Sequence, residues 1–179
     1  MTTSPLLAAA KIVVDFPGVR ALDGVDFDLL AGEVHALMGE NGAGKSTLIR
    51  VFTGLQRVDS GSIALVGAPI APRSPREAED AGIRAVFQEI DLVPTLSIAE
   101  NVTLGREPTR FGFVDRGAAR RRAASALARL RVDVDVDRTL GACSIATQQL
   151  VAIARALDAT CRVLILDEPT SSLDADETE

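Results

Sequence analysis

Short apolar runs, separated by polar and glycine-rich stretches, mark the elements that this chain of 179 residues is expected to form. Between Ile12 and Leu30, apolar residues alternate with aspartates, and Pro17-Gly18 interrupts the alternation. Period-two alternation places apolar side chains on one face of a strand, so we predict an antiparallel strand pair. Two further buried strands are predicted at 83–87 and 162–166, because each mainly apolar run ends in polar residues.

A second pattern combines an apolar run with glycines and a helical repeat. The run at 34–38 predicts a strand, and 39–44 is rich in glycine. From Lys45 to Phe52, apolar residues recur at helical spacing until Gly54 stops them. Strand, glycine loop and helix in this order, with further strands and helices, predict an α/β fold.

Between residues 105 and 141 the composition shifts to arginine and alanine. Ala123, Leu127 and Leu130 share one face of a predicted helix, so we interpret the segment as a helical insertion. Its arginines could form a solvated helix face or contact phosphate or RNA, and charge runs favour the solvated face. They are Arg120, Arg121, Arg122 and Arg129.

Composition narrows the class of protein. The 19 basic and 25 acidic residues give a net charge of −6, and tryptophan and tyrosine are absent, which argues against a general nucleic-acid binder. No apolar run approaches the roughly 18 residues of a membrane helix, and Leu6–Ala10 is too short for a secretory signal. Two cysteines, Cys143 and Cys161, indicate free thiols in a reducing compartment.

The segment from Gly39 to Thr47 follows the pattern G-x-x-x-x-G-K-[ST], after a predicted strand and at the start of a predicted helix. Its glycines let backbone N–H groups converge on phosphate, Lys45 can neutralise the β- and γ-oxygens, and Ser46 can reach Mg²⁺. The predicted phosphate-binding residues are Gly39, Glu40, Asn41, Gly42, Ala43, Gly44, Lys45, Ser46 and Thr47.

Two adjacent carboxylates, Asp167 and Glu168, follow the predicted strand at 162–166. Asp167, at the strand tip, suits Mg²⁺ coordination, whereas Glu168 can polarise the water that attacks the γ-phosphate. Together with the phosphate loop, this pair predicts an ATPase.

Residues 143–157 resemble the signature segment of the ATP-binding-cassette (ABC) ATPase family and the helix that follows it. The family pattern L-S-G-G-Q aligns with 143–147, where Ser144 alone matches and Ala146 places a methyl group at a glycine position. The resemblance runs from about Ile12 to the last residue. It implies that Ser144 contacts the γ-phosphate of ATP across a dimer.

The same resemblance implies roles for other positions. Phe16 resembles the aromatic residue that stacks on adenine, although core packing is an equal alternative. Gln88 resembles the glutamine that touches Mg²⁺ and the water and that senses the membrane partner. Asp174 belongs to a segment, 171–174, that resembles the loop at the dimer interface. His35, the only histidine, is interpreted as a strand residue without a catalytic role.

The family fold implied here is a P-loop NTPase core of α/β class with an antiparallel β subdomain and a helical insertion subdomain. Residues 1–179 would form a partial ATP-binding domain, with the helical subdomain at about 90–155. In this family the strand that follows the 171–174 loop lies between the strands at 34–38 and 163–166, and it is not among residues 1–179. Without it, the two central strands would have unpaired backbone groups. We therefore expect residues 1–179 alone to be marginally folded and to hydrolyse little ATP.

Several segments are similar to the energy subunits of carbohydrate importers of the ribose, xylose and galactose type, namely 16–25, 35–44, 88–94 and 96–102. This implies an ATPase that uses ATP and Mg²⁺ at the cytoplasmic face of the inner membrane. Its implied partners are permease subunits, a second cassette in a head-to-tail dimer and a periplasmic sugar-binding protein, without nucleic acid. Alternatives are a nucleotide-binding module without turnover and a soluble ABC ATPase acting on nucleic acid or ribosomes.

Overall fold

A computed structural model describes residues 4–40, 42–87, 92–157 and 160–167. The chain divides into two compact units, Met1–Arg84 and Ala85–Glu179, which are described separately. Within the described ranges, no helix is long and apolar enough to cross a membrane.

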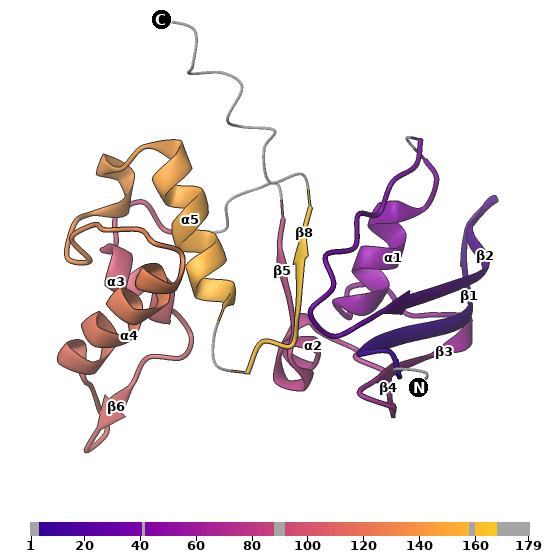
Figure 1. Cartoon of the computed structure of the whole chain (residues 1–179), viewed down its shortest axis with the longest axis horizontal. Coiled ribbons are helices and arrows are strands. Elements are labelled where there is room, and N and C mark those ends of the chain that lie inside the picture. The colour runs from indigo at the N-terminus through magenta and orange to yellow at the C-terminus, as the bar shows by residue number, and fades with distance from the viewer. Residues whose placement is uncertain (1–3, 41, 88–91, 158–159, 168–179) are drawn as a thin grey trace, which may run out of the picture. The chain divides into compact units, whose positions relative to one another are not determined.

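A four-stranded antiparallel sheet with the order β2-β1-β3-β4 forms much of the first unit (Figure 1). The predicted strand pair is confirmed as β1 (Leu7–Phe16) and β2 (Val19–Leu29), although β1 begins earlier than the alternation indicated. The sequence analysis did not predict the hairpin of β3 (Ser60–Leu65) and β4 (Ala68–Ile70).

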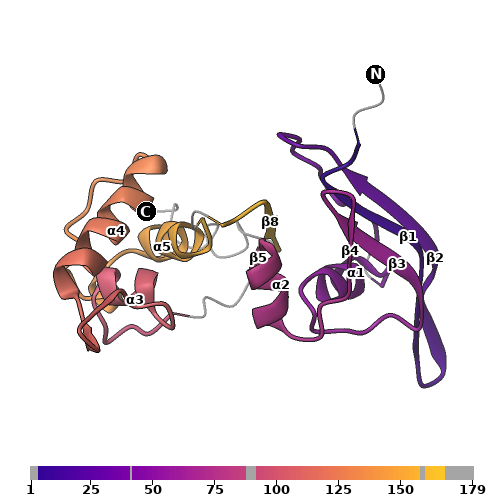
Figure 2. The same ribbon diagram turned by 90° about the horizontal axis from the view of Figure 1, so that it is seen from below.

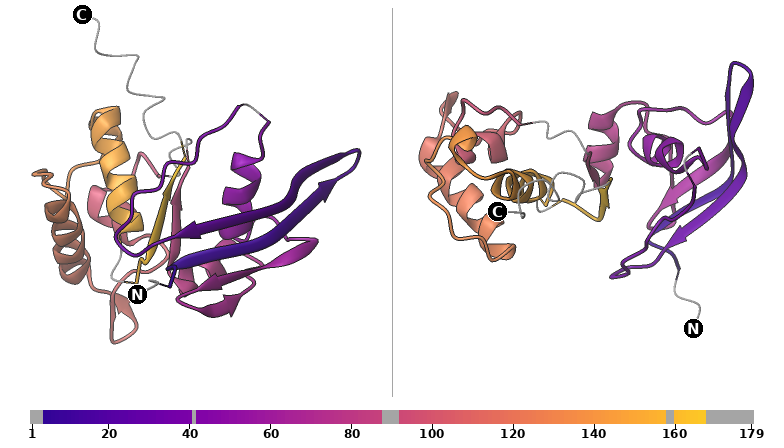
Figure 3. Two further views of the ribbon diagram at one scale, coloured as in Figure 1. Left: turned by 45° about the vertical axis from the view of Figure 1, so that its right-hand side comes forward. Right: turned by 90° about the horizontal axis from the view of Figure 1, so that it is seen from above.

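Helix α1 (Lys45–Phe52) has the bounds that the apolar spacing predicted. It buries Leu48, Ile49, Val51 and Phe52, and the Phe52 ring lies 5.2 Å from the ring of Phe27 in β2. Figures 2 and 3 show the helix on one face of the curved sheet. Helix α2 (Pro75–Ala81) follows, with Ser74 as its N-cap and Gly82 at its end.

The strand predicted at 34–38 is wrong, because residues 33–40 have no regular secondary structure. Val34 is 99% exposed and Met38 is 87% exposed. An apolar run becomes a strand only when a neighbouring strand supplies backbone hydrogen-bond partners, and none of the named strands pairs with this segment. The predicted sheet position of His35 is wrong for the same reason. His35 is exposed and its Nδ1 lies 3.2 Å from Glu33 Oε1.

Three helices form the core of the second unit: α3 (Ile98–Thr103), α4 (Arg116–Arg129) and α5 (Ile145–Ala156). A short 3₁₀ helix, η1 (Leu140–Ala142), precedes α5. The three α-helices pack on one another around an apolar cluster, and the predicted helical insertion contributes Ala123 and Leu127 to it. The cluster comprises Ile98, Ala99, Val102, Ala123, Ala126, Leu127, Leu140, Val151 and Ala154.

The arginines of α4 lie mainly on its solvated face, as charge runs usually do. Arg120, Arg121 and Arg129 are exposed, and Arg120 Nε donates to Asp137 Oδ1 at 2.6 Å. Arg122 is partly buried and its Nη1 donates to the carbonyl oxygen of Arg106 at 3.0 Å.

Two small sheets complete the described structure. The predicted strands at 83–87 and 162–166 are confirmed as β5 (Ile83–Val86) and β8 (Val163–Leu166), which pair with each other. Between α3 and α4, β6 (Thr109–Arg110) and β7 (Phe113–Val114) form a hairpin that the sequence analysis did not predict.

Candidate functional site

The loop from Gly39 to Gly44 leads directly into α1. Gly42 and Gly44 both have a φ of +87°, a left-handed conformation that favours glycine. A β-carbon at Gly44 would lie 2.7 Å from the carbonyl oxygen of Ala21 and from Leu22 Cδ2 in β2. The helix can therefore start against the sheet only because residue 44 has no side chain.

Helix α1 begins without a side-chain cap and without an acidic residue in its first turn. Each of α2 to α5 instead has an N-cap residue whose side chain accepts a backbone N–H. These residues are Ser74, Ser97, Asp115 and Ser144. The first N–H groups of a helix need acceptors, and the helix dipole favours an anion there. The uncapped start of α1, next to a glycine loop, fits a phosphate group.

The side chain of Lys45 folds back over the same loop. Its Nζ donates to the carbonyl oxygens of Gly39 at 2.5 Å and Glu40 at 2.9 Å. Ser46 is exposed in the first turn of α1 and Thr47 is partly buried. The loop thus gathers one ammonium group, one hydroxyl and the helix start, while the predicted Asn41 lies outside the described residues.

Phe16 ends β1 and is 37% exposed. The side chain is therefore only partly covered by the core, which leaves it accessible to a ligand, and its stacking on adenine stays a prediction. Phe16 pairs with Val19, and Val19 stands two residues before Ala21, against which Gly44 packs. Phe16 and the phosphate loop thus both lie beside the first residues of β2.

Asp167 follows β8 directly and is partly buried. Its backbone N donates to the carbonyl oxygen of Val86 at 3.0 Å, which fixes the residue at the end of the strand. The predicted Gln88, Glu168 and Asp174 lie outside the described residues. Among the residues that are described, no three of His, Cys, Asp and Glu gather in a way that could hold a metal ion.

Ser144 is the N-cap of α5, so this helix starts inside the predicted signature segment. Its Oγ accepts from Thr147 N at 3.2 Å and lies 3.0 Å from Thr147 Oγ1. Ala146 stands in the first helical turn and is exposed. The exposed hydroxyl of Ser144 is therefore held at a helix start by a residue that departs from the family pattern.

Asn101, which the sequence analysis missed, is fully buried in α3. Its side-chain oxygen accepts from Val93 N at 2.8 Å, and its Nδ2 donates to the carbonyl oxygens of Val93 and Ser97, both at 3.0 Å. No distinct signal in the sequence marks it, because α3 also contains the polar residues Glu100 and Thr103. Asn101 therefore ties the segment before α3 to the helix.

The segment before α3, residues 93–97, is also hydrogen-bonded to η1, the short helix before α5. Leu140 N donates to the carbonyl oxygen of Leu96 at 3.0 Å, and Gly141 N donates to that of Pro94 at 2.9 Å. Asn101 thus binds the segment 93–97, and the same segment is hydrogen-bonded to η1, which precedes α5.

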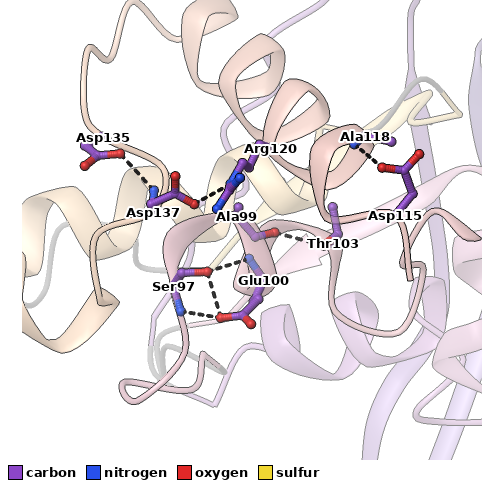
Figure 4. Close-up of polar contacts among 9 residues, drawn as sticks. All are labelled: Ser97, Ala99, Glu100, Thr103, Asp115, Ala118, Arg120, Asp135 and Asp137. Carbon is purple, nitrogen blue, oxygen red and sulfur yellow. Dashed lines mark hydrogen bonds and ion pairs between the residues drawn. The ribbon is translucent and has the colours of Figure 1, made fainter. Parts of the chain in front are cut away.

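A capping box fixes the start of α3 (Figure 4). Ser97 N and Ser97 Oγ donate to Glu100 Oε2 at 2.8 and 2.7 Å, and Glu100 N donates back to Ser97 Oγ at 3.2 Å. The backbone and side-chain donors of Ser97 stabilise the carboxylate and hold the pKa of Glu100 below its usual value, and the charge of Arg116 adds to this shift.

Comparison with protein families gives one match, which spans residues 22–171 and is described as ABC transporter. Among similar proteins, the ribose import ATP-binding protein RbsA 1 of Rubrobacter xylanophilus is 53% identical over 94% of this chain. The galactofuranose transporter ATP-binding protein YtfR of Escherichia coli K12 is 51% identical over 92% of it. These alignments cover 34% and 33% of the relatives, so the chain spans about a third of their length.

Solved structures with the same fold include the ADP conformation of an ATP-binding cassette of an ABC transporter. It matches with a TM-score of 0.81 and 29% identity, over 95% of this chain and 71% of that one. A dimeric cassette in a post-hydrolysis state, bound to ADP and Pi, matches with a TM-score of 0.72 and 26% identity, over 94% and 76% of the two chains. The fold of this chain is therefore that of an ATPase cassette.

Proposed function

The chain belongs to the ABC transporter family, and on that premise we propose that it binds ATP at the start of α1 and hydrolyses it to power the import of a sugar. The observation that carries the proposal is the uncapped helix start, where Gly44 packs on β2 and Lys45 lies over the loop. The relatives named as import ATP-binding proteins for ribose and galactofuranose support the sugar as cargo.

Each residue of the loop has a distinct task in this proposal. The N–H groups at the start of α1 bind phosphate oxygens, and Lys45 exchanges the carbonyl oxygens of Gly39 and Glu40 for the β- and γ-oxygens. The exposed ring of Phe16 stacks on adenine.

Ser46, Asp167 and Gln88 would hold Mg²⁺, whose charge neutralises phosphate oxygens when it is bound. The exposed hydroxyl of Ser46 and the position of Asp167 at a strand end fit this role. Glu168 polarises the attacking water. Ser144 and Asp174 act on a second cassette, Ser144 through its hydroxyl on the γ-phosphate and Asp174 at the dimer interface.

The partners proposed are the permease subunits, a second cassette in a head-to-tail dimer and, indirectly, a periplasmic sugar-binding protein, at the cytoplasmic face of the membrane. A solved cassette with this fold is dimeric, which supports the second cassette. A nucleotide-binding module without turnover is the second candidate. The contact of Ser144 Oγ with Thr147 favours it, because this hydroxyl already has a partner.

The deciding experiment compares two variants with the unmodified protein. We expect Glu168→Gln to retain ATP binding and to lose phosphate release, whereas Asp167→Asn should weaken the Mg²⁺ dependence of binding. For both variants, isothermal calorimetry measures the binding of ATP, and phosphate release measures its hydrolysis. Normal turnover of Glu168→Gln would contradict the role of Glu168, and ATP binding without turnover in the unmodified protein would establish the second candidate.

A further inference from the structure

The β6–β7 hairpin presents large apolar side chains to solvent. Phe111 is 89% exposed and Phe113 is 80% exposed, and Val114 and Leu104 are also exposed. Phe111 and Gly112 form the turn, both with positive φ, so a two-residue tip carries the Phe111 ring. In Figure 1 the hairpin labelled β6 extends away from the helices of its unit. Exposed aromatic residues gathered at a projecting tip are typical of an interaction site rather than of scattered surface residues.

The hairpin lies within the most basic part of the chain. Residues 104–131 contain eight arginines and two carboxylates, a net charge of +6, whereas the whole chain has −6 and the remainder therefore −12. The guanidinium of Arg110 lies 5.4 Å from the centre of the Phe111 ring. The two carboxylates are engaged locally, because Glu107 accepts from Gly105 N and Asp115 caps α4. Arg110, Phe111 and Phe113 therefore dominate what the tip itself offers to a partner, whereas Arg120 in α4 is paired with Asp137.

An anionic lipid surface complements this combination. Phenylalanine rings enter the boundary between headgroups and acyl chains, while arginines remain at the level of the anionic headgroups. A cytoplasmic loop of a membrane protein is a poorer partner, since such loops carry an excess of lysine and arginine and would repel the hairpin. Single-stranded nucleic acid is also a poorer fit, because it is bound along grooves with successive stacking residues, and a projecting two-residue tip offers none.

We propose that the β6–β7 hairpin inserts Phe111 and Phe113 into the interface of an anionic bilayer, with Arg110 and its neighbouring arginines on the headgroups. This contact adds to the proposed function, on which it rests for the presence of a membrane beside the chain. It would hold the helical unit at the lipid surface independently of nucleotide.

The absence of tryptophan and tyrosine from the chain provides a direct test. Phe111→Trp introduces a single fluorophore at the tip, and Leu55→Trp introduces one at an exposed apolar position of the first unit as a matched control. Both are titrated with vesicles of phosphatidylcholine alone and of phosphatidylcholine with phosphatidylglycerol. We expect a blue shift and quenching by brominated lipid for Phe111→Trp with the anionic vesicles, a loss of both in high salt, and no change for Leu55→Trp.

Co-flotation of the unlabelled chain gives a second readout. The double variant Phe111→Ser, Phe113→Ser should lower partitioning onto anionic vesicles by about tenfold or more, whereas Leu55→Ser should leave it unchanged. A missing shift at position 111, an equal shift at position 55, or binding to single-stranded RNA without binding to vesicles would each overturn the inference. Nucleotide binding, measured in the same samples, reports on the proposed function separately.

Discussion

The α-carbon of Gly44 lies so close to β2 that a β-carbon on it would be 2.7 Å from the carbonyl oxygen of Ala21. Nothing in the phosphate-loop pattern itself requires this contact. It couples the start of α1 to the sheet, so the sheet determines where the N–H groups of the helix lie. The glycine has a packing role in addition to its conformational one.

Substitution of the two left-handed glycines separates these roles. Gly42 has the same φ of +87°, but a β-carbon there would meet no atom within 4 Å. Gly42→Ala should therefore cost about 1 kcal/mol of unfolding free energy from backbone strain alone. Gly44→Ala should cost about 1–3 kcal/mol more, because the methyl group overlaps backbone that cannot move freely. Urea unfolding measures both, and equal losses would show that the contact with Ala21 is unimportant.

Removal of the Lys45 ammonium should weaken nucleotide binding without unfolding the chain. Lys45→Ala loses a charge-assisted phosphate contact worth on the order of 2 kcal/mol, or about thirtyfold in affinity. Arg50→Ala is the matched control, because it removes one positive charge from an exposed position of the same helix. Titration calorimetry with ATP compares the two. Equal affinities for both variants would contradict the assignment of Lys45.

The buried amide of Asn101 should be required for the stability of the second unit. Asn101→Ala leaves the backbone groups of Val93 and Ser97 without this partner and should cost about 2–4 kcal/mol. Thr103→Val is the control, since it removes a buried hydroxyl that bonds only within α3, to the carbonyl oxygen of Ala99 at 2.8 Å, and should cost about 1 kcal/mol. Hydrogen exchange of the η1 and α5 amides should increase in Asn101→Ala and stay unchanged in Thr103→Val.

The capping box should make the stability of α3 depend on acid pH. The folded pKa of Glu100 is lowered, chiefly by the backbone N–H of Ser97, so its contribution is complete above the unfolded pKa of about 4.3 and is lost as the pH falls through the folded value. Glu100 is exposed, so this contribution is about 0.5 kcal/mol. Glu100→Gln should be less stable than the unmodified chain at pH 7 by that amount and equally stable near pH 3. Urea unfolding at several pH values measures the difference in unfolding free energy between the two proteins. A difference that does not change with pH would show that the Glu100 carboxylate is not its cause.

Sequence reasoning was most successful where structure depends on neighbouring residues. The bounds of α1 and the antiparallel pairing of β1 and β2 follow from apolar spacing and from the glycines and proline between elements. The phosphate loop was likewise evident from the order of its residues. These signals are local, since each uses side chains a few positions apart.

Tertiary structure decided the features that depend on distant partners. The run at 34–38 is apolar enough for a strand, yet it forms none, because a strand exists only beside another strand. Phe16 could have been buried or exposed, and the position of the strand end in the sheet left its ring at the surface. Asn101 acquires its role only from backbone groups that the chain folds around it. The sequence by itself thus determined the bounds of α1, the β1–β2 pair and the two strands that became β5 and β8. Packing over long distances determined which residues lie exposed and which backbone groups the buried amide of Asn101 binds.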